Sequence, residues 1–377
     1  MSSTVYFTDF SATSRENLTD KTARLILRAG LAKAVESTDL CAVKIHFGEK
    51  GNTAFIRPPY IASILKTIKN KGGRPFLTDA NTLYKGSRSD SVSHIKTAVE
   101  NGFSFSSMDS VPVIIADGLL GKTETAVEVN RKNCGLAYIG TEIVQADALV
   151  SVAHFKGHEL TGFGGTLKNL GMGCASRRGK LEQHSDVSPK IKRKNCIGCG
   201  ECAAHCPAEA IRLQEEKAYL DDQKCIGCGE CIVRCPARAV TIRWNQTIPT
   251  FFEKMIEYTE GVLKNKQGKC LFVNFISDVS PKCDCVPFNE YPIVRDIGIA
   301  ASTDPVALDQ ASVDLVNNEP ALEGSALETN REKGKDKFAG LYPKVDWPYQ
   351  LEYAEQLGLG TRQYVLETVE TLSYPSS

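Results

Sequence analysis

The chain contains two copies of one sixteen-residue cysteine motif, and this repeat constrains its fold more than any other feature. The copies are CIGCGECAAHCPAEAI from Cys196 and CIGCGECIVRCPARAV from Cys225, which match at 11 positions and begin 29 residues apart. Each copy has the spacing Cys-x2-Cys-x2-Cys-x3-Cys-Pro, which holds 4Fe-4S clusters through cysteine thiolates. The repeat therefore predicts two 4Fe-4S clusters.

This spacing also predicts how the cysteines are shared. The first three cysteines of a run bind one cluster, and the fourth binds the other cluster. The first predicted cluster has the ligands Cys196, Cys199, Cys202 and Cys235. The second has the ligands Cys225, Cys228, Cys231 and Cys206. Because such clusters gain and lose single electrons, we expect the chain to transfer electrons.

Zinc sites and disulfides are the alternatives for so many cysteines, and both fit less well. Structural zinc sites use paired Cys-x2-4-Cys units and do not need a third step or a following proline. Disulfides belong to oxidising compartments. The first residues, MSSTVYFTDFSATSREN, lack the charged and apolar pattern of an export signal. We therefore expect a cytoplasmic protein from an anaerobic setting.

The charge balance argues against two classes of partner. Lys plus Arg and Asp plus Glu both number 45, so the formal net charge is zero. No overall field then favours nucleic acid or an anionic membrane. No apolar run reaches the ~18 residues that are needed to cross a bilayer. We expect a redox partner protein instead, either a ferredoxin-like carrier or an acceptor enzyme.

The repeat fills only a small part of the 377 residues, so further domains are expected. Elsewhere, short β-branched runs alternate with amphipathic stretches, which is typical of a mostly parallel α/β sheet with flanking helices. We predict an α/β domain in two parts, residues 1–187 and 245–377. A small α+β ferredoxin-like domain with the two clusters is predicted as an insertion at 188–244.

Seven segments of the α/β part read as strands that end on a polar residue. They are VYFTDF, CAVKIHF, RPFLTDA, VPVIIAD, ALVSVAHF, CLFVNFISD and YPIVRDIG, with Asp9, His46, Asp79, Asp117, His154, Asp278 and Asp296 near their ends. Helices are predicted over 17–36 and 58–73, and after Asp304. Since parallel strands direct their carboxyl ends toward a binding crevice, these polar residues are expected to converge. For any single aspartate, the alternative is a loop start or a helix cap.

A glycine-rich, basic segment at residues 154–180 is the second candidate site. Five glycines lie within residues 161–173, and glycine lets backbone N–H groups approach an anionic ligand. The segment matches no complete nucleotide-binding motif.

Histidine titrates near neutral pH and lysine positions negative charge. The candidate catalytic residues are His46, His154, His158 and Lys168. The candidates for binding a cofactor or a small anionic substrate are Arg57, Gly162, Gly164, Gly165 and Lys168. If the segment is helical, His154 and His158 could also chelate a metal, whereas the alternative is a pair of surface histidines.

The sequence Cys283-Asp284-Cys285 lies in a polar loop, SPKCDCVPF, where packing does not explain it. Two thiols one residue apart could ligate a metal jointly or react with an electrophile. If Cys174 meets Cys283 and Cys285 in space, the three could hold an additional metal or redox cofactor. An incidental pair of loop cysteines is the alternative.

Five segments resemble the domain of unknown function 362 family, here fused to a two-cluster ferredoxin. They are KIHFGEKGNTAFIRP (44–58), FLTDANTLYKGSR (76–88), GHELTGFGGTLKNLGMGCASRRGK (157–180), CDC (283–285) and DIGIAASTDPVALDQAS (296–312). The resemblance extends over about residues 3–360. It implies an α/β domain that often accompanies iron–sulfur clusters, and it supplies no established catalytic residues.

Three functions remain open at this point. The first is a ferredoxin-linked iron–sulfur oxidoreductase that relays electrons through two clusters between an external carrier and a substrate or cofactor in the α/β crevice. The second is a non-enzymatic electron carrier or assembly partner for another protein. The third is a metal-dependent hydrolase or racemase in which the clusters are only structural.

Overall fold

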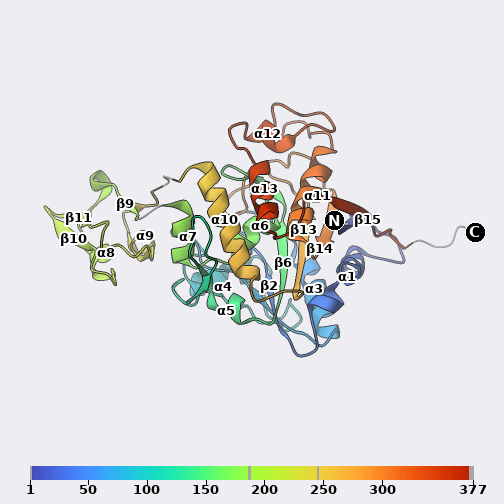
Figure 1. Cartoon of the computed structure of the whole chain (residues 1–377), viewed down its shortest axis with the longest axis horizontal. Helices are drawn as coiled ribbons and strands as arrows, with labels where there is room; N and C mark the ends of the chain where they lie inside the picture. Colours follow the sequence, from blue (N-terminus) through green and yellow to red (C-terminus); the bar gives the residue numbers. More distant parts are fainter. Residues whose placement is uncertain (1, 186–187, 244–245, 373–377) are drawn as a thin grey trace, which may run out of the picture.

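A seven-stranded sheet runs through the larger part of the molecule in the computed structural model, which describes residues 2–185, 188–243 and 246–372 (Figure 1). Four of the six neighbouring strand pairs in this sheet are parallel, and both antiparallel pairs involve one strand, β14. In spatial order the strands are β15 (Tyr364–Thr368), β1 (Ser3–Asp9), β14 (Gly298–Ser302), β13 (Cys270–Ile276), β6 (Ala148–His154), β2 (Leu40–Lys44) and β3 (Arg74–Thr78). The predicted mostly parallel α/β sheet is confirmed.

Helices cover both faces of the sheet, because its central strands are apolar on both sides. Leu149 and Phe272 pack with one helical layer, whereas the next residues, Val150 and Val273, pack with the other. The first layer contains α6 (Thr166–Gly171), α10 (Ile248–Leu263), α11 (Pro305–Asn317) and α13 (Pro348–Gln356). The second contains α1 (Leu18–Arg28), α2 (Leu31–Ala34), α3 (Pro58–Asn70) and α4 (Ser91–Glu100). The result is a three-layer α/β/α domain.

The capping residues that the sequence suggested for one helix have that role in the structure, and one predicted helix is divided in two. Asp304 caps α11 by accepting hydrogen bonds from the N–H groups of Val306 and Ala307, and Pro305 takes the first helical position. The predicted helix over 17–36 is divided into α1 and α2, because Gly30 adopts a left-handed φ of 107°.

Two of the predicted strands are wrong. Residues 111–117 form only an isolated parallel bridge, between Val113 and Leu77. Residues 291–297 have no strand structure, and the strand of that region is β14, which begins at Gly298. Both segments are apolar because their side chains are buried in the core, as Val111 and Ile293 show. An apolar run in the sequence therefore did not distinguish a buried loop from a strand.

Shorter elements complete the sheet domain. They are the hairpin β4 (Glu124–Glu128) and β5 (Leu136–Gly140), the hairpin β7 (Lys156–His158) and β8 (Gly162–Gly164), and the helices α5 (Thr141–Gln145), α7 (Arg177–His184) and α12 (Lys337–Leu341). None of the helices within the described part of the chain combines the length and apolar character that a membrane span requires.

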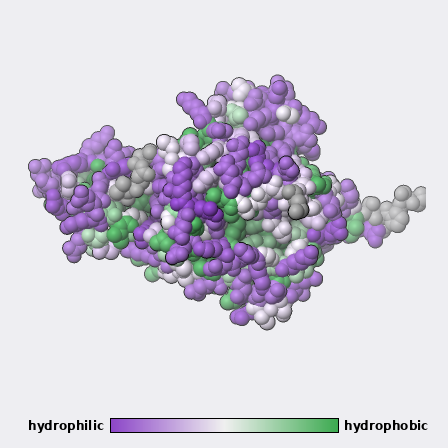
Figure 2. All heavy atoms as spheres, in the orientation of Figure 1, coloured by the Kyte–Doolittle hydropathy of each residue, from purple (hydrophilic) through white to green (hydrophobic). Residues whose placement is uncertain are grey.

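Residues 188–243 form a small lobe that projects from one side of the sheet domain (Figure 1). Its surface is largely hydrophilic in the view of Figure 2. Its core gathers Cys202, Cys231 and Cys235, and two side chains of the sheet domain, Leu83 and Leu181, join them. The lobe contains β9 (Lys190–Ile191), the 3-10 helix η1 (Arg193–Asn195), α8 (Glu201–Ala204), β10 (Ile211–Gln214), β11 (Lys217–Leu220), α9 (Glu230–Arg234) and β12 (Val240–Thr241).

Candidate functional site

A cavity of about 430 Å³ lies beyond the carboxyl ends of β2, β3 and β6. The residues that follow or end these strands, His46, Asp79 and His154, all line it. The glycine-rich segment adds further lining residues, namely His158, Gly164, Gly165 and Lys168. Cys283 and Cys285 line the same cavity. Residues that are far apart in the sequence therefore meet at one edge of the sheet, as parallel strand topology favours.

Asp284 is fully buried between the lining residues Cys283 and Cys285 and lies close to three basic side chains of the cavity. Its buried carboxylate lies 3.1 Å from Lys156 Nζ and 3.4 Å from Nδ1 of both His46 and His154. Burial by itself would raise the pKa of Asp284, but His46, Lys156 and His154 hold this pKa well below its usual value. The carboxylate is therefore ionised and fixes the turn that carries the two cysteines.

Cys283 is the most activated thiol of the cavity. The Lys168 ammonium donates a hydrogen bond to its sulfur at 3.6 Å, and Cys285 lines the cavity with it. Hydrogen bonding from Cys285, with help from Lys168 and Lys156, lowers the pKa of Cys283 to about 6 although burial acts in the opposite direction. The thiolate of Cys283 therefore predominates at neutral pH. In the thiol form, its sulfur can donate to Asp284 Oδ1 at 3.5 Å.

His46 and His158 are held neutral, which corrects the expectation that they titrate near pH 7. Burial and Arg88 lower the pKa of His46 well below its usual value, and burial and Lys168 do the same for His158. Nδ1 of His46 accepts from the N–H of Gly48, so the ring proton sits on Nε2, which is buried without a hydrogen-bond partner. Both histidines lie in or next to strands rather than in a helix.

His154 has a different environment. Its Nε2 faces the carbonyl oxygen of Ser277 at 2.8 Å, and its Nδ1 faces the Asp284 carboxylate at 3.4 Å. Both ring nitrogens therefore face oxygen atoms of the turn region that follows β13. His154 therefore braces Asp284, and it does not present a free lone pair to the cavity.

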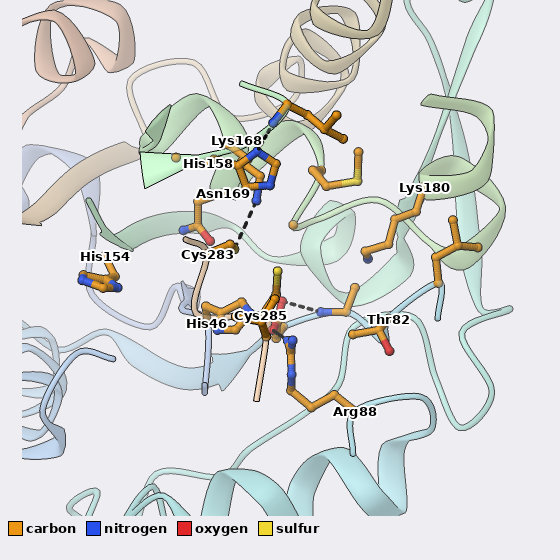
Figure 3. A pocket seen from close by; sticks show the side chains of 18 of the residues that line it. His46, Thr82, Arg88, His154, His158, Lys168, Asn169, Lys180, Cys283 and Cys285 are labelled. Atoms are coloured by element: carbon orange, nitrogen blue, oxygen red, sulfur yellow. Dashed lines mark hydrogen bonds and ion pairs between the residues drawn. The ribbon is translucent and has the colours of Figure 1, made fainter. Parts of the chain in front are cut away.

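Two cations of the cavity lack a carboxylate partner. Within the described part of the chain, neither Lys168 nor Lys180 lies in ion-pair distance of an Asp or Glu side chain. Lys180 donates instead to the carbonyl of Ala175, and burial lowers its pKa to about 8. By contrast, Lys44 pairs with Asp79 at 2.9 Å. Figure 3 shows Lys168, Lys180 and His46 reaching the cavity from different sides. These groups suit an anionic ligand.

The remaining wall of the cavity is apolar. Leu160, Met172, Ile242 and Phe251 line it, and the His184 ring stacks on Phe251 with 4.8 Å between the centroids. Burial lowers the pKa of His184 to about 3, so this ring is neutral. A cavity with cations at one end and an apolar wall suits an organic anion better than an inorganic one.

Three of the predicted site residues do not reach the cavity. The Arg57 side chain is 66 % exposed and lies 4.0 Å from Asp278, and its residue is the N-cap of α3. Gly162 packs against Trp347, where an added Cβ would lie 2.6 Å from the Trp347 Cβ. Cys174 is fully buried beneath the lining residues and contacts the carbonyl of Asn169. The proposed three-cysteine centre is therefore not assembled around the cavity.

Sequence reasoning missed several residues that shape the cavity. Asp284 is the central one, and the others are Lys44, Arg88, Lys156 and Lys180. Lys156 and Lys180 lie in the basic segment that the sequence singled out, and Lys44 and Arg88 lie in segments that carry the family resemblance. Their positions in those segments were the available signal, but charge alone does not show which lysines are buried.

The eight cysteines of the repeat fall into two groups in the projecting lobe. One small cavity is lined by Cys196, Cys199, Cys202 and Cys235, and a second by Cys206, Cys225, Cys228 and Cys231. These groups match the two predicted ligand sets, including the exchange of the fourth cysteine. Among the described residues, no three His, Cys, Asp or Glu side chains are placed to hold a single metal ion. A cubic cluster has a different requirement, because it distributes its four ligands over four irons.

The two copies of the motif share one backbone conformation. Gly198 and Gly200 have φ of 70° and 77°, and their counterparts Gly227 and Gly229 both have 69°. In each copy, an N–H donates to the sulfur of the fourth cysteine at 3.2 Å, from Ala210 to Cys206 and from Ala239 to Cys235. Such N–H···S bonds stabilise thiolates. The residues and the backbone therefore fit two 4Fe-4S clusters.

The second copy faces the sheet domain. Glu230 is buried there, 3.2 Å from both Arg177 Nη1 and Lys122 Nζ. Its counterpart in the first copy, Glu201, has a side chain that is 50 % exposed. Gly229 lies against Arg177 and Leu83, and Leu83 also lines the large cavity. The cysteines of the second copy are therefore the nearer ones to the cavity.

The alkylation of Cys283 tests this description directly. We expect iodoacetamide to label Cys283 with a rate that rises through pH 6 and then levels, because only the thiolate reacts. Replacing Cys285 with alanine removes the hydrogen-bond donor and should move the midpoint to higher pH. Mass spectrometry of timed samples gives the rates, and free cysteine, with a pKa near 8.5, is the reference. A midpoint in the native protein that equals the reference would contradict the assignment.

Comparison with known proteins gives a family match but no curated relative. A family model described as "Domain of unknown function (DUF362)" matches residues 41–314. No curated protein matches the chain. Among solved structures, 11 chains match.

Two of these structures show how distant the likeness is. The lactate racemase apoprotein from Thermoanaerobacterium thermosaccharolyticum is 14 % identical with a TM-score of 0.37, over 72 % of this chain and 51 % of that chain. A protein from Thermotoga maritima is 10 % identical with a TM-score of 0.34, over 68 % and 49 % of the two chains. The aligned region thus spans about half of each of these structures.

Proposed function

The chain belongs to the family described as Domain of unknown function (DUF362), and from its site we propose that it is an iron–sulfur oxidoreductase that acts on a small organic anion. The observation that carries this proposal is the contact between two features. The lobe with two sets of four cysteines packs, through Gly229 and Leu83, against the wall of a cavity whose Lys168 and Lys180 have no Asp or Glu partner among the described residues.

The eight cysteines of the lobe would hold two 4Fe-4S clusters, which supply single electrons when bound. The orientation of the lobe supports an order in which electrons would pass through the two clusters. Cys199 and Ile197 of the first copy are exposed, so this copy is accessible to an external electron carrier. The second copy is turned toward the cavity by Glu230, Arg177 and Lys122.

The residues of the cavity bind and orient the substrate in this proposal. Lys168 and Lys180 attract its negative group, and His46 donates a hydrogen bond from Nε2–H. The apolar wall of Met172, Ile242 and Phe251 excludes water from the organic part. Since Lys168 also contacts Cys283, the bound anion would lie next to the activated thiolate.

The test uses protein that is purified and kept without oxygen. We expect about eight irons and eight acid-labile sulfides per chain. After reduction by dithionite, small organic anions are screened for their ability to restore the visible absorbance of oxidised clusters. For an active compound, Lys168→Ala should lower the rate about tenfold or more at unchanged iron content, because it removes a cation that positions the anion.

The matched control is Lys96→Ala, since Lys96 is a lysine on α4 with a side chain that is 71 % exposed. This variant should react like the native protein. Protein that contains no iron and no acid-labile sulfide would overturn the proposal. Equal rates in Lys168→Ala and the native protein for every active compound would remove the cavity from it.

The two other functions that the sequence left open stay predictions. An electron carrier or assembly partner does not need a cavity lined by Lys168 and Lys180, and a metal-dependent hydrolase or racemase does not need an activated thiolate in that cavity. No specific feature of the described residues favours either of them over the oxidoreductase.

A further inference from the structure

Cys283 and Cys285 lie one residue apart in a tight turn at the cavity. The N–H of Val286 donates to the carbonyl of Cys283 at 3.2 Å, which closes the turn. A turn of this kind keeps its residues within a few ångströms of one another. Both cysteines line the same cavity, and neither is in a disulfide. Two cysteines that lie one residue apart in one turn meet the first requirement for an S–S bond between them, which is a short separation of their Cα atoms.

The turn is held from several sides. The Asp284 carboxylate pairs with Lys156 at 3.1 Å, and the backbone carbonyl of Asp284 accepts from the N–H of Glu49 at 3.1 Å. The carbonyl of Cys285 accepts from the Tyr84 hydroxyl at 3.0 Å. Because these bonds involve backbone groups and the Asp284 carboxylate, they leave both sulfurs free to react.

A short segment connects this turn with the lobe. Leu83 contacts the second cysteine run, since a Cβ added to Gly229 would lie 3.1 Å from Leu83 Cδ1. The next residue, Tyr84, holds Cys285 through its hydroxyl. Leu83 and Tyr84 are consecutive residues, and together they connect the second cysteine run with the turn that carries the two cavity cysteines.

The surroundings of the thiols select for negative charge. Lys168 lies 3.6 Å from the Cys283 sulfur, and Lys180 lines the same cavity without a carboxylate partner in the described chain. A thiolate normally repels an anion, but these two cations offset that repulsion. The apolar wall opposite accommodates the uncharged part of a ligand.

We propose that Cys283 and Cys285 are a reversible dithiol–disulfide couple and that the cavity takes small anionic disulfides as substrates. This inference rests on the proposed function for its supply of electrons. The Cys283 thiolate attacks one sulfur of the substrate disulfide, which breaks that S–S bond, forms a mixed disulfide and releases one substrate thiolate.

The Cys285 sulfur then attacks Cys283. The mixed disulfide breaks, the second substrate thiolate leaves, and the proton of Cys285 goes to water or to that thiolate. The Cys283–Cys285 disulfide that remains is restored to thiolate and thiol by two electrons and one proton. The two electrons come from the external carrier of the proposed function.

The experiment follows both thiols in one peptide. Trypsin cleavage after Lys282 and Arg295 releases residues 283–295, which contain Cys283 and Cys285 and no other cysteine. Anaerobic protein is equilibrated with mixtures of reduced and oxidised dithiothreitol, alkylated with iodoacetamide and digested. We expect this peptide to carry two alkyl groups in reducing mixtures and an internal disulfide in oxidising ones.

Charge selection is tested with two disulfide probes, dianionic 3,3′-dithiodipropionate and dicationic cystamine. The anionic probe should oxidise the pair about tenfold faster or more, by the attraction of the buried cations. This preference should fall in Lys168→Ala and persist in the exposed control Lys96→Ala. In Cys285→Ser, the anionic probe should remain attached to Cys283 as a mixed disulfide, because no second thiol displaces it.

Two results would overturn the inference. One is a peptide that keeps two alkyl groups in every mixture, and the other is a Cys285→Ser variant that forms no mixed disulfide with either probe. Iron and sulfide are measured in the same samples. If the clusters are intact and the thiols do not react, this inference alone is contradicted. If the thiols undergo disulfide exchange but the protein holds no iron, the proposed function is contradicted and the dithiol–disulfide couple is still supported.

Discussion

Replacing Cys206 with alanine is expected to remove the cluster that Cys225, Cys228 and Cys231 would hold, although Cys206 belongs to the other cysteine run. The reason is that Cys206 lines the same small cavity as these three cysteines. Iron should fall from about eight to about four per chain. The same loss is expected for Cys228→Ala.

Double variants distinguish this arrangement from ligation within each run. Cys206→Ala combined with Cys228→Ala should lose no more iron than either change alone, because both ligands serve one cluster. Cys206→Ala combined with Cys199→Ala should lose nearly all iron, because the two ligands serve different clusters. If the second pair of changes removed only half of the iron, each run would hold its own cluster. Cys41→Ala, a change of a buried cysteine outside the runs, is the control.

Asp79→Asn is expected to give the largest loss of stability of any single change in the cavity. The Asp79 carboxylate is buried 2.9 Å from Lys44 and within 3.6 Å of Arg88 and His94. Removing one charge of a buried pair leaves the others uncompensated, which costs about 3–5 kcal/mol of the free energy of unfolding. Denaturant unfolding, monitored by circular dichroism without oxygen, measures this difference.

The pH dependence of this loss has a definite sign. Burial alone would raise the pKa of Asp79, but Lys44 and His94 hold it well below its usual value. A lowered carboxylate pKa gives stability that is fully present above the unfolded pKa and is lost only as pH falls through the folded one. The difference between the native protein and Asp79→Asn should therefore stay constant between about pH 7 and pH 5 and shrink only in stronger acid.

Asp109→Asn is the control for Asp79→Asn. Asp109 also pairs with a lysine, Lys69 at 2.7 Å, but both side chains are more than 40 % exposed. Asp109 has a left-handed φ of 54°, which asparagine also tolerates. An exposed pair of this kind contributes about 1 kcal/mol or less. Equal losses of stability in the two variants would show that burial of the Asp79 pair has no special weight.

Part of the site could be predicted because it follows from strand ends. His46 and His154 lie at the carboxyl ends of parallel strands that are neighbours in the sheet, and such ends meet at one edge. Asp9 and Asp278 also follow strands, but their side chains are exposed away from the cavity. No local pattern in the sequence predicts that the cavity lies at the ends of β2, β3 and β6, because strand order arises from long-range pairing.

For the basic segment at residues 154–180, too, part of the site could be predicted from the sequence and part could not. Its composition pointed to Lys168, Gly164 and Gly165, which line the cavity, but the hairpin of β7 and β8 turns Gly162 toward Trp347. Besides its neighbour Cys285, Cys283 owes its lowered pKa to Lys168, which is 115 residues away in the sequence. No local pattern contains such a contact.

By itself, the sequence determined the two cysteine runs, the grouping of their cysteines, the mostly parallel α/β class and the cap of α11, because each of these depends on the spacing of residues that are close along the chain. The tertiary structure alone decided that the second run faces the sheet domain, that Asp284 gathers three basic side chains, and that the buried Cys174 does not line the cavity with Cys283 and Cys285. These features depend on which distant segments pack together, and packing is set by the whole buried surface rather than by any local spacing.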